Sequence, residues 1–163
     1  MKKKFGFTLI EVLIVVLLIS IISTVAVLTI GSNQQKQLEN FANKIKQLII
    51  LAEQEAMLRP ATLGVAFTED EMQFYILASD SKTWSEIQEK PFQTRNIPKN
   101  ISATVSINGE NKKFTGEPQI AVFSNLSTTP FLITLTLENH ETSYKITGDN
   151  TGNIIAEAAS EDD

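Results

Sequence analysis

Glu11 is the residue whose type and position point most clearly to a function. It carries the only charge in residues 7–30, which are otherwise dominated by apolar side chains. A carboxylate near the centre of a membrane-spanning helix costs on the order of 2–3 kcal/mol, and such residues usually have a functional role. We therefore expect Glu11 to pair with a positive group at the same depth.

Few other residues have side chains that could act in catalysis or metal binding, and they are scattered along the sequence. His140 is the only histidine, and it falls in a predicted hairpin turn with no nucleophile or base nearby. Residues 149–153 combine oxygen ligands with a glycine, but they lack the spacing and the terminal bidentate Glu of a calcium loop, so a turn is expected. The chain has no cysteine, which excludes thiolate chemistry and Cys-based zinc sites. We predict no catalytic residues, no metal, no cofactor and no enzyme activity.

Composition narrows the class of protein further. A length of 163 residues suits one domain with an appendage. The net charge is −5, and the cations Lys2, Lys3 and Lys4 at the N-terminus leave a still more acidic remainder. Binding to nucleic acid requires clustered Lys and Arg, so this balance argues against a nucleic-acid partner.

Residues 7–30 are predicted to form a transmembrane helix. A helix of this length rises roughly 36 Å, which exceeds a bilayer core of about 30 Å. The lysines precede it and no cationic cluster follows, which predicts a cytoplasmic N-terminus and the rest of the chain outside. A cleaved signal peptide would have a shorter apolar core, and Thr24-Val25-Ala26 is a poor cleavage site. A plain membrane anchor is the remaining alternative, but it would leave Glu11 unexplained.

Residues 31–59 continue the helix in amphipathic form. Apolar residues recur there at steps of three and four positions, which predicts one buried stripe: Leu38, Phe41, Ala42, Ile45, Leu48, Ile49, Ala52 and Ala56. Polar residues, Glu53 among them, fall outside the stripe. Gly31-Ser32-Asn33 is expected to bend or fray the helix. Pro60 ends it, because a proline pushes the preceding residue out of α geometry.

Residues 60–163 change to a period of two, which predicts strands. We expect strands at 63–67, 72–77, 101–107, 119–123, 131–138, 143–147 and 152–156, with a turn at Asn108-Gly109. Residues 79–97 are expected to form a long loop that could contain an eighth strand, with Trp84 half-buried. Residues 157–163 are expected to form an acidic tail. The predicted fold is α+β: one long N-terminal helix on an antiparallel β domain of two small sheets.

The run Gly6-Phe7-Thr8-Leu9-Ile10-Glu11 resembles the class III leader of type IV pilins and type II secretion pseudopilins. The resemblance implies that prepilin peptidase cuts between Gly6 and Phe7, removing leader 1–6, and that Phe7 becomes N-methylated. It also implies that Glu11 pairs with the N-terminal amine of an adjacent subunit during assembly. Such a pair is also expected on physical grounds, because the new ammonium and the carboxylate would each need a partner in an apolar setting.

The later part of the chain resembles the H-type minor pseudopilins of type II secretion, the GspH/FimT family. Six runs carry this resemblance: Glu55-Ala56-Met57-Leu58-Arg59, Thr62-Leu63-Gly64-Val65, Phe74-Tyr75, Thr129-Pro130-Phe131-Leu132-Ile133-Thr134-Leu135, Tyr144-Lys145-Ile146, and Gly148-Asp149-Asn150-Thr151-Gly152-Asn153-Ile154. One departure is Ser124-Asn125-Leu126-Ser127, where the family often has a proline–glycine turn. A minor type IV pilin (FimT-like) acting in pilus assembly or DNA uptake is the alternative within the superfamily.

The resemblance implies a minor pseudopilin near the tip of the periplasmic pseudopilus, which drives folded exoproteins through an outer-membrane secretin. The implied partners are the I, J and K minor pseudopilins, the major pseudopilin, prepilin peptidase and the inner-membrane secretion platform. The implied location is the cell inner membrane, single-pass, with residues 60–163 in the periplasm. A membrane-anchored periplasmic enzyme or substrate-binding module would leave both the Gly6–Phe7 junction and Glu11 as coincidences.

Overall fold

The structure is a computed structural model that describes residues 9–59, 61–78, 82–138 and 142–159, with only the backbone described for 22–32. The chain divides into two compact units, Met1–Lys36 and Gln37–Asp163. His140 and most of the acidic tail lie outside the described residues.

Helix α1 spans Leu9–Leu58. It is continuous through Gly31-Ser32-Asn33, so the fraying expected there is not found. Arg59 closes the last turn through its backbone N–H, which donates to the carbonyl oxygen of Glu55 at 3.1 Å, and the two side chains form an ion pair. This end agrees with the one predicted from Pro60.

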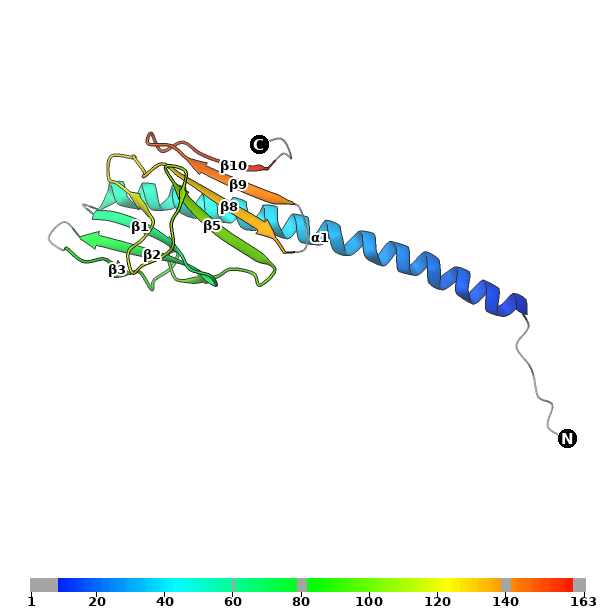
Figure 1. The fold of residues 1–163 in the computed structure, drawn as a ribbon. Helices are drawn as coiled ribbons and strands as arrows, with labels where there is room; N and C mark the ends of the chain where they lie inside the picture. Colours follow the sequence, from blue (N-terminus) through cyan, green and yellow to red (C-terminus); the bar gives the residue numbers. More distant parts are fainter. Residues whose placement is uncertain (1–8, 60, 79–81, 139–141, 160–163) are drawn as a thin grey trace. The chain divides into compact units, whose positions relative to one another are not determined.

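The second unit buries one face of α1. The predicted apolar stripe is confirmed, because its members are at most 7% exposed apart from the half-buried Phe41. Three of the buried positions are alanines, which allow the sheets to approach the helix backbone closely. The strands of both sheets run alongside this part of α1 (Figure 1).

The first sheet contains five strands, all paired antiparallel, in the order β3-β2-β1-β7, with β4 also paired to β2. These strands are β1 (Ala61–Phe67), β2 (Glu71–Ala78), β3 (Ser85–Glu86), β4 (Arg95–Asn96) and β7 (Ile120–Val122). The register of β1 and β2 places Val65 opposite Phe74. Both are fully buried, as the alternation of large apolar residues predicts.

The second sheet is antiparallel with the order β10-β9-β8-β5-β6. Its strands are β5 (Ile101–Ile107), β6 (Glu110–Asn111), β8 (Phe131–Leu137), β9 (Ser143–Gly148) and β10 (Ile154–Ala158). The central strand β8 alternates strictly, with Phe131, Ile133, Leu135 and Leu137 buried and the residues between them half-buried. These residues join the α1 stripe and the first sheet in one hydrophobic core.

All seven predicted strands are present, and the two-sheet α+β fold is confirmed. Asn108 and Gly109 both have positive φ, 53° and 81°, as the predicted tight turn requires. Three strands were not assigned a place from the sequence: β3, β4 and β6. Each has two residues, which is too short for a period to be read.

Gly64 lies where two side chains cover the outer face of the first sheet. A Cβ atom built on Gly64 would lie 2.7 Å from Cβ of Pro118 and 2.9 Å from the Trp84 ring. Trp84 is therefore half-buried, as expected, because it packs over β1. A glycine is needed here for close approach rather than for backbone conformation.

Gly64→Ala should lower the free energy of unfolding by about 1–3 kcal/mol, because the added methyl group collides with a rigid proline ring. Thr104→Ala on the exposed part of β5 is the control and should change stability by about 0.5 kcal/mol or less. Urea unfolding of the full chain in detergent measures both. Equal stability of the two variants would contradict the packing argument.

Candidate functional site

The predicted cleavage site, Gly6 and Phe7, lies outside the described residues, so processing and N-methylation stay predictions. Glu11 is described and lies in the first turn of α1. A carboxylate is favoured there, because the N-terminal end of a helix carries a partial positive charge. Its side chain is exposed on the described chain, which leaves it accessible to a partner.

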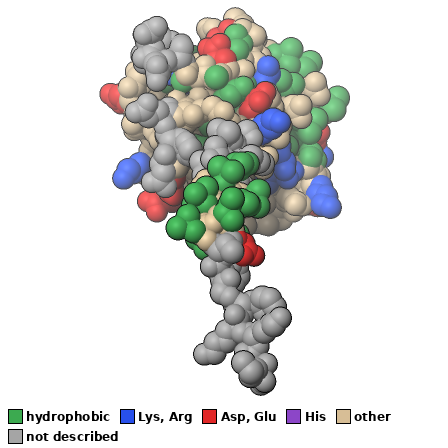
Figure 2. Space-filling view, turned by 90° about the vertical axis from the view of Figure 1, so that its right-hand side faces the viewer, with side chains coloured by type: hydrophobic (Ala, Val, Ile, Leu, Met, Phe, Trp, Pro, Cys, Tyr) green, Lys and Arg blue, Asp and Glu red, His purple; other side chains and the backbone are tan. Residues whose placement is uncertain are grey.

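The helix surface around Glu11 is apolar and open. Every large hydrophobic side chain from Leu9 to Ile21 is exposed, between 46% and 83%. This segment is largely green in Figure 2. Contiguous apolar surface of this kind marks a membrane or protein interaction site, because water solvates it poorly. The segment therefore needs either lipid or other apolar helices around it.

Within the described part of the chain, no helix combines the length and the hydrophobicity that spanning a bilayer requires.

In the second unit, two loops lie together beside α1. The first, residues 123–130, joins β7 to β8, and the second, residues 149–153, joins β9 to β10; we call them the loop pair. The buried Thr128 links them, because its hydroxyl donates to the carbonyl oxygen of Asp149 at 2.7 Å. A Cβ atom on Gly152 would collide with the carbonyl oxygen of Leu126, so the two backbones are in close contact.

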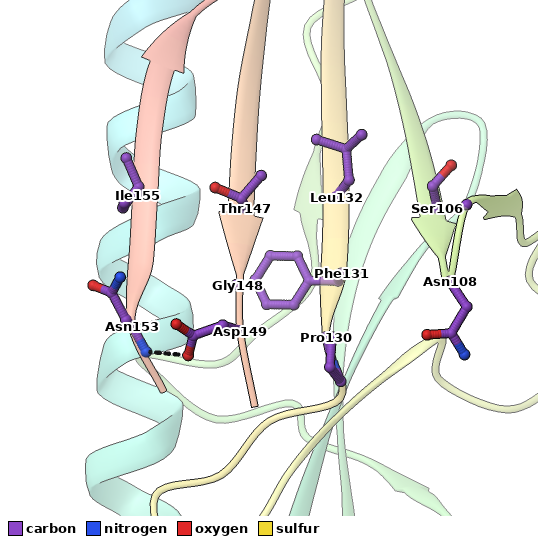
Figure 3. Close-up of a pocket in the computed structure, with 11 residues that line it drawn as sticks. Ser106, Asn108, Pro130, Phe131, Leu132, Thr147, Gly148, Asp149, Asn153 and Ile155 are labelled. Carbon is purple, nitrogen blue, oxygen red and sulfur yellow. Dashed lines mark hydrogen bonds between the residues drawn. The ribbon is translucent and has the colours of Figure 1, made fainter. Parts of the chain in front are cut away.

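Asp149 organises the second loop. Its Oδ1 accepts from the backbone N–H of Thr151 at 2.8 Å, from the Thr151 hydroxyl at 2.6 Å and from the backbone N–H of Asn153 at 3.1 Å. The last of these bonds is drawn in Figure 3. The bonds to Thr151 and Asn153 lower the pKa of Asp149, because they favour its charged form. The carboxylate thus acts within its own turn, the role expected for residues 149–153.

The burial of Glu53 does not follow from the sequence pattern. It falls outside the predicted apolar stripe, yet it is only 5% exposed. The second loop covers it: a Cβ on Gly152 would lie 3.2 Å from Glu53 Oε1. That oxygen has no hydrogen-bond partner among the residues that the structure describes. Burial, and then the charge of Asp149, raises the pKa of Glu53 to about 6.

Leu126 holds an unusual conformation at the tip of the first loop. Its φ is +64°, in the left-handed region. That region costs about 1–2 kcal/mol for a residue with a Cβ, and only Gly, Asn and Asp visit it routinely. The side chain is 42% exposed, as is that of Phe123 at 41%. No sequence pattern signalled either feature, because leucine disfavours this conformation.

A shallow pocket of about 470 Å³ lies on the second sheet at the same end (Figure 3). Leu132, Thr147 and Ile155 line it from adjacent strands, and the Phe131 ring packs over Gly148 at its edge. Asp149 and Asn153 form its polar rim, and their hydrogen-bonding groups are engaged in the turn. No group of three or more His, Cys, Asp or Glu side chains gathers within the described part of the chain.

Glu53 should make stability depend on pH. Its folded pKa of about 6 exceeds the ordinary value of 4.5, so the folded state holds the proton more tightly. The free energy of unfolding should then fall by about 1–2 kcal/mol as pH rises from about 4.5 to about 6. Glu53→Gln should abolish this fall and raise stability at pH 7, as followed by thermal melting.

Glu39→Gln is the matched control, because Glu39 is exposed on the same helix. It should retain the pH profile of the unmodified chain. An unchanged profile in Glu53→Gln would show that another group controls the dependence.

Comparisons with known proteins agree with this architecture. Residues 1–27 match the prokaryotic N-terminal methylation motif. A protein of Pseudomonas aeruginosa named type II secretion system protein H is 28% identical over 146 residues, covering 83% of this chain and 84% of the relative. A protein of the same name from Aeromonas hydrophila is 22% identical over 154 residues, covering 85% of this chain and 84% of the relative.

Two solved structures share the fold. The minor pseudopilin EpsH of the type II secretion system of Vibrio cholerae superposes with a TM-score of 0.66 at 21% identity, covering 79% of this chain and 99% of that one. The solution structure of Escherichia coli GspH gives 0.66 at 13% identity, covering 78% and 92%. The chain thus carries the N-terminal methylation motif, is similar over most of its length to two type II secretion system H proteins, and shares its fold with two solved pseudopilins.

Proposed function

We propose that the chain is a minor pseudopilin of a type II secretion system, incorporated near the tip of the periplasmic pseudopilus. The observation that carries this proposal is the exposed apolar helix that begins at a prepilin-type motif and contains one carboxylate, Glu11. The names of the relatives matched over most of the chain support secretion rather than pilus formation. The pseudopilus would drive folded exoproteins through the outer-membrane secretin.

Processing would prepare the chain for this assembly. Prepilin peptidase would cut between Gly6 and Phe7 and methylate Phe7, and the new ammonium group would pair with Glu11 of a neighbouring subunit. Glu11 lies in the first turn of α1, and in the sequence it is four residues from Phe7. The pair would set the register of one subunit on the next, because either charge alone would be costly among apolar helices.

Residues 7–30 would anchor the chain in the inner membrane before assembly, and residues 31–59 would carry the helix on into the β domain. The lysines of the leader would keep the N-terminus in the cytoplasm. Residues 60–163 would then lie in the periplasm. The exposed apolar side chains from Leu9 to Ile21 suit lipid first and neighbouring helices later, because both surroundings are apolar.

The proposed partners are the I, J and K minor pseudopilins, the major pseudopilin and the inner-membrane platform. The role is mechanical assembly rather than catalysis. A minor type IV pilin in DNA uptake is the second candidate, but DNA binding would favour a basic surface. The net charge is −5, and Figure 2 shows Lys and Arg interspersed with Asp and Glu on the face in view.

Deletion of the gene tests the assignment. Folded exoproteins should accumulate in the periplasm, while twitching and transformation remain intact. Activity of a secreted enzyme in medium and in periplasmic extract measures this, and the wild-type gene on a plasmid should restore export. The reverse pattern, normal export with lost twitching or transformation, would support the pilus alternative instead.

Glu11→Leu should give a chain that inserts and is cut but does not enter the pseudopilus, because the partner ammonium is left without its carboxylate. Co-purification with the major pseudopilin from detergent extracts measures incorporation. Glu39→Gln should incorporate normally. Gly6→Val should remain uncut on a gel and serves as the processing-defective reference. Normal incorporation of Glu11→Leu would refute the pairing role.

A further inference from the structure

The first loop of the loop pair displays two large apolar side chains to solvent. Phe123 and Leu126 are 41% and 42% exposed, on a loop that follows the buried strand residue Val122. Exposed apolar residues scattered singly are ordinary, but two on one short loop form a local apolar projection. We call Phe123 and Leu126 the apolar knob.

The backbone at Leu126 is strained, although its side chain is not fully buried. Glycine or asparagine would adopt φ near +64° with little cost, whereas leucine does not. A leucine at such a position is expected where its side chain fills the core, yet this one stays 42% exposed. Strain at a residue that remains partly exposed points to a role for the exposed part of the side chain.

Hydrogen bonds hold the knob rigid. The backbone N–H of Phe123 donates to the Ser127 carbonyl at 2.9 Å, and that of Leu126 donates to the Phe123 carbonyl at 3.2 Å. Asn125 Oδ1 accepts from both the backbone N–H and the hydroxyl of Ser127, at 3.2 Å and 2.6 Å. A loop fixed in this way loses little conformational entropy when a partner binds.

Contacts with the second loop of the loop pair also hold the loop that carries the knob in place. The Thr128 hydroxyl donates to the Asp149 carbonyl, and the Leu126 carbonyl abuts Gly152. The knob is thus part of the second unit's framework rather than a free tip. Its position relative to β8 and β10 is fixed by these contacts.

The charges around the knob define its partner. Residues 118–137 contain no charged side chain, so the loop that carries the knob is itself neutral. The nearest loop contributes Asp149, which is exposed and held ionised by its own turn. A complementary surface therefore has an apolar pocket for two side chains and a Lys or Arg at its rim that faces Asp149.

We propose that Phe123 and Leu126 form a preorganised docking knob that inserts into an apolar pocket with a cationic rim on the globular domain of a neighbouring pseudopilin. This proposal rests on the proposed function for the identity of the neighbour. It assigns the contact to a particular loop and explains why the strained leucine is present. Large apolar side chains in desolvated pockets supply most of the energy of a protein interface.

Photo-crosslinking in cells tests the contact. Benzoylphenylalanine replaces Phe123 in one full-length chain and Ile155 in another. Ile155 is the matched control, because it is apolar and 44% exposed but lies in the regular strand β10. Antibodies to the I, J, K and major pseudopilins identify the products. Position 123 should give a specific crosslink to one of these subunits, and position 155 should not.

Leu126→Asn separates docking from folding. Asparagine accepts the left-handed conformation, so the melting temperature of the full chain in detergent should stay the same or rise by a few degrees. The crosslink formed from position 123 should nevertheless weaken by about tenfold or more, as for loss of an interface anchor. Ile155→Thr should leave the crosslink unchanged.

Three results would overturn the docking proposal. They are equal crosslinking from positions 123 and 155, crosslinks only to lipid or to an exoprotein, and a full-strength crosslink in Leu126→Asn. Co-purification of the unmodified chain with the other pseudopilins tests the proposed function separately. If the chain co-purifies with none of them, both proposals fail; if it co-purifies but position 123 does not crosslink, only the knob fails.

Discussion

The burial of one face of α1 against two antiparallel sheets is the interaction on which the second unit depends. The stripe from Leu38 to Ala56 joins β1, β2 and β8 in a single core, with no disulfide available to supplement it. Its alanines are as important as its larger residues, because Ala42, Ala52 and Ala56 are fully buried and let the sheets pack close to the helix. A small domain without cross-links depends on such packing for stability.

The same helix faces two different surroundings along its length. Between Leu9 and Ile21 every large apolar side chain is exposed. From Leu38 to Ala56 the residues of the stripe are covered or half-buried and most exposed positions are polar, although Leu51, Met57 and Leu58 are exposed. A hydrophobic surface of the first kind is unsuited to water, so the first unit is complete only with lipid or partner helices. The sequence encodes this division as a change from all-round hydrophobicity to an amphipathic stripe.

Where the structure follows local periodicity, the sequence was sufficient to predict it. The α1 stripe, the alternation of β8 and the turn at Asn108 each follow from residue types a few positions apart. The burial of Glu53 does not, because it is covered by a loop far along the chain whose approach depends on Gly152. The conformation of Leu126 was equally inaccessible, since tertiary contacts impose a φ that its side chain disfavours.

These two exceptions meet in one place. Glu53 is covered although its Oε1 has no hydrogen-bond partner among the described residues, and Leu126 accepts strain while it stays 42% exposed; the loop pair joins them through Gly152. A cluster in which residue type and packing conflict has often been retained for a purpose other than stability. The cluster lies at one end of the second sheet, where a rigid surface can be presented to another subunit without disturbing the core beneath it.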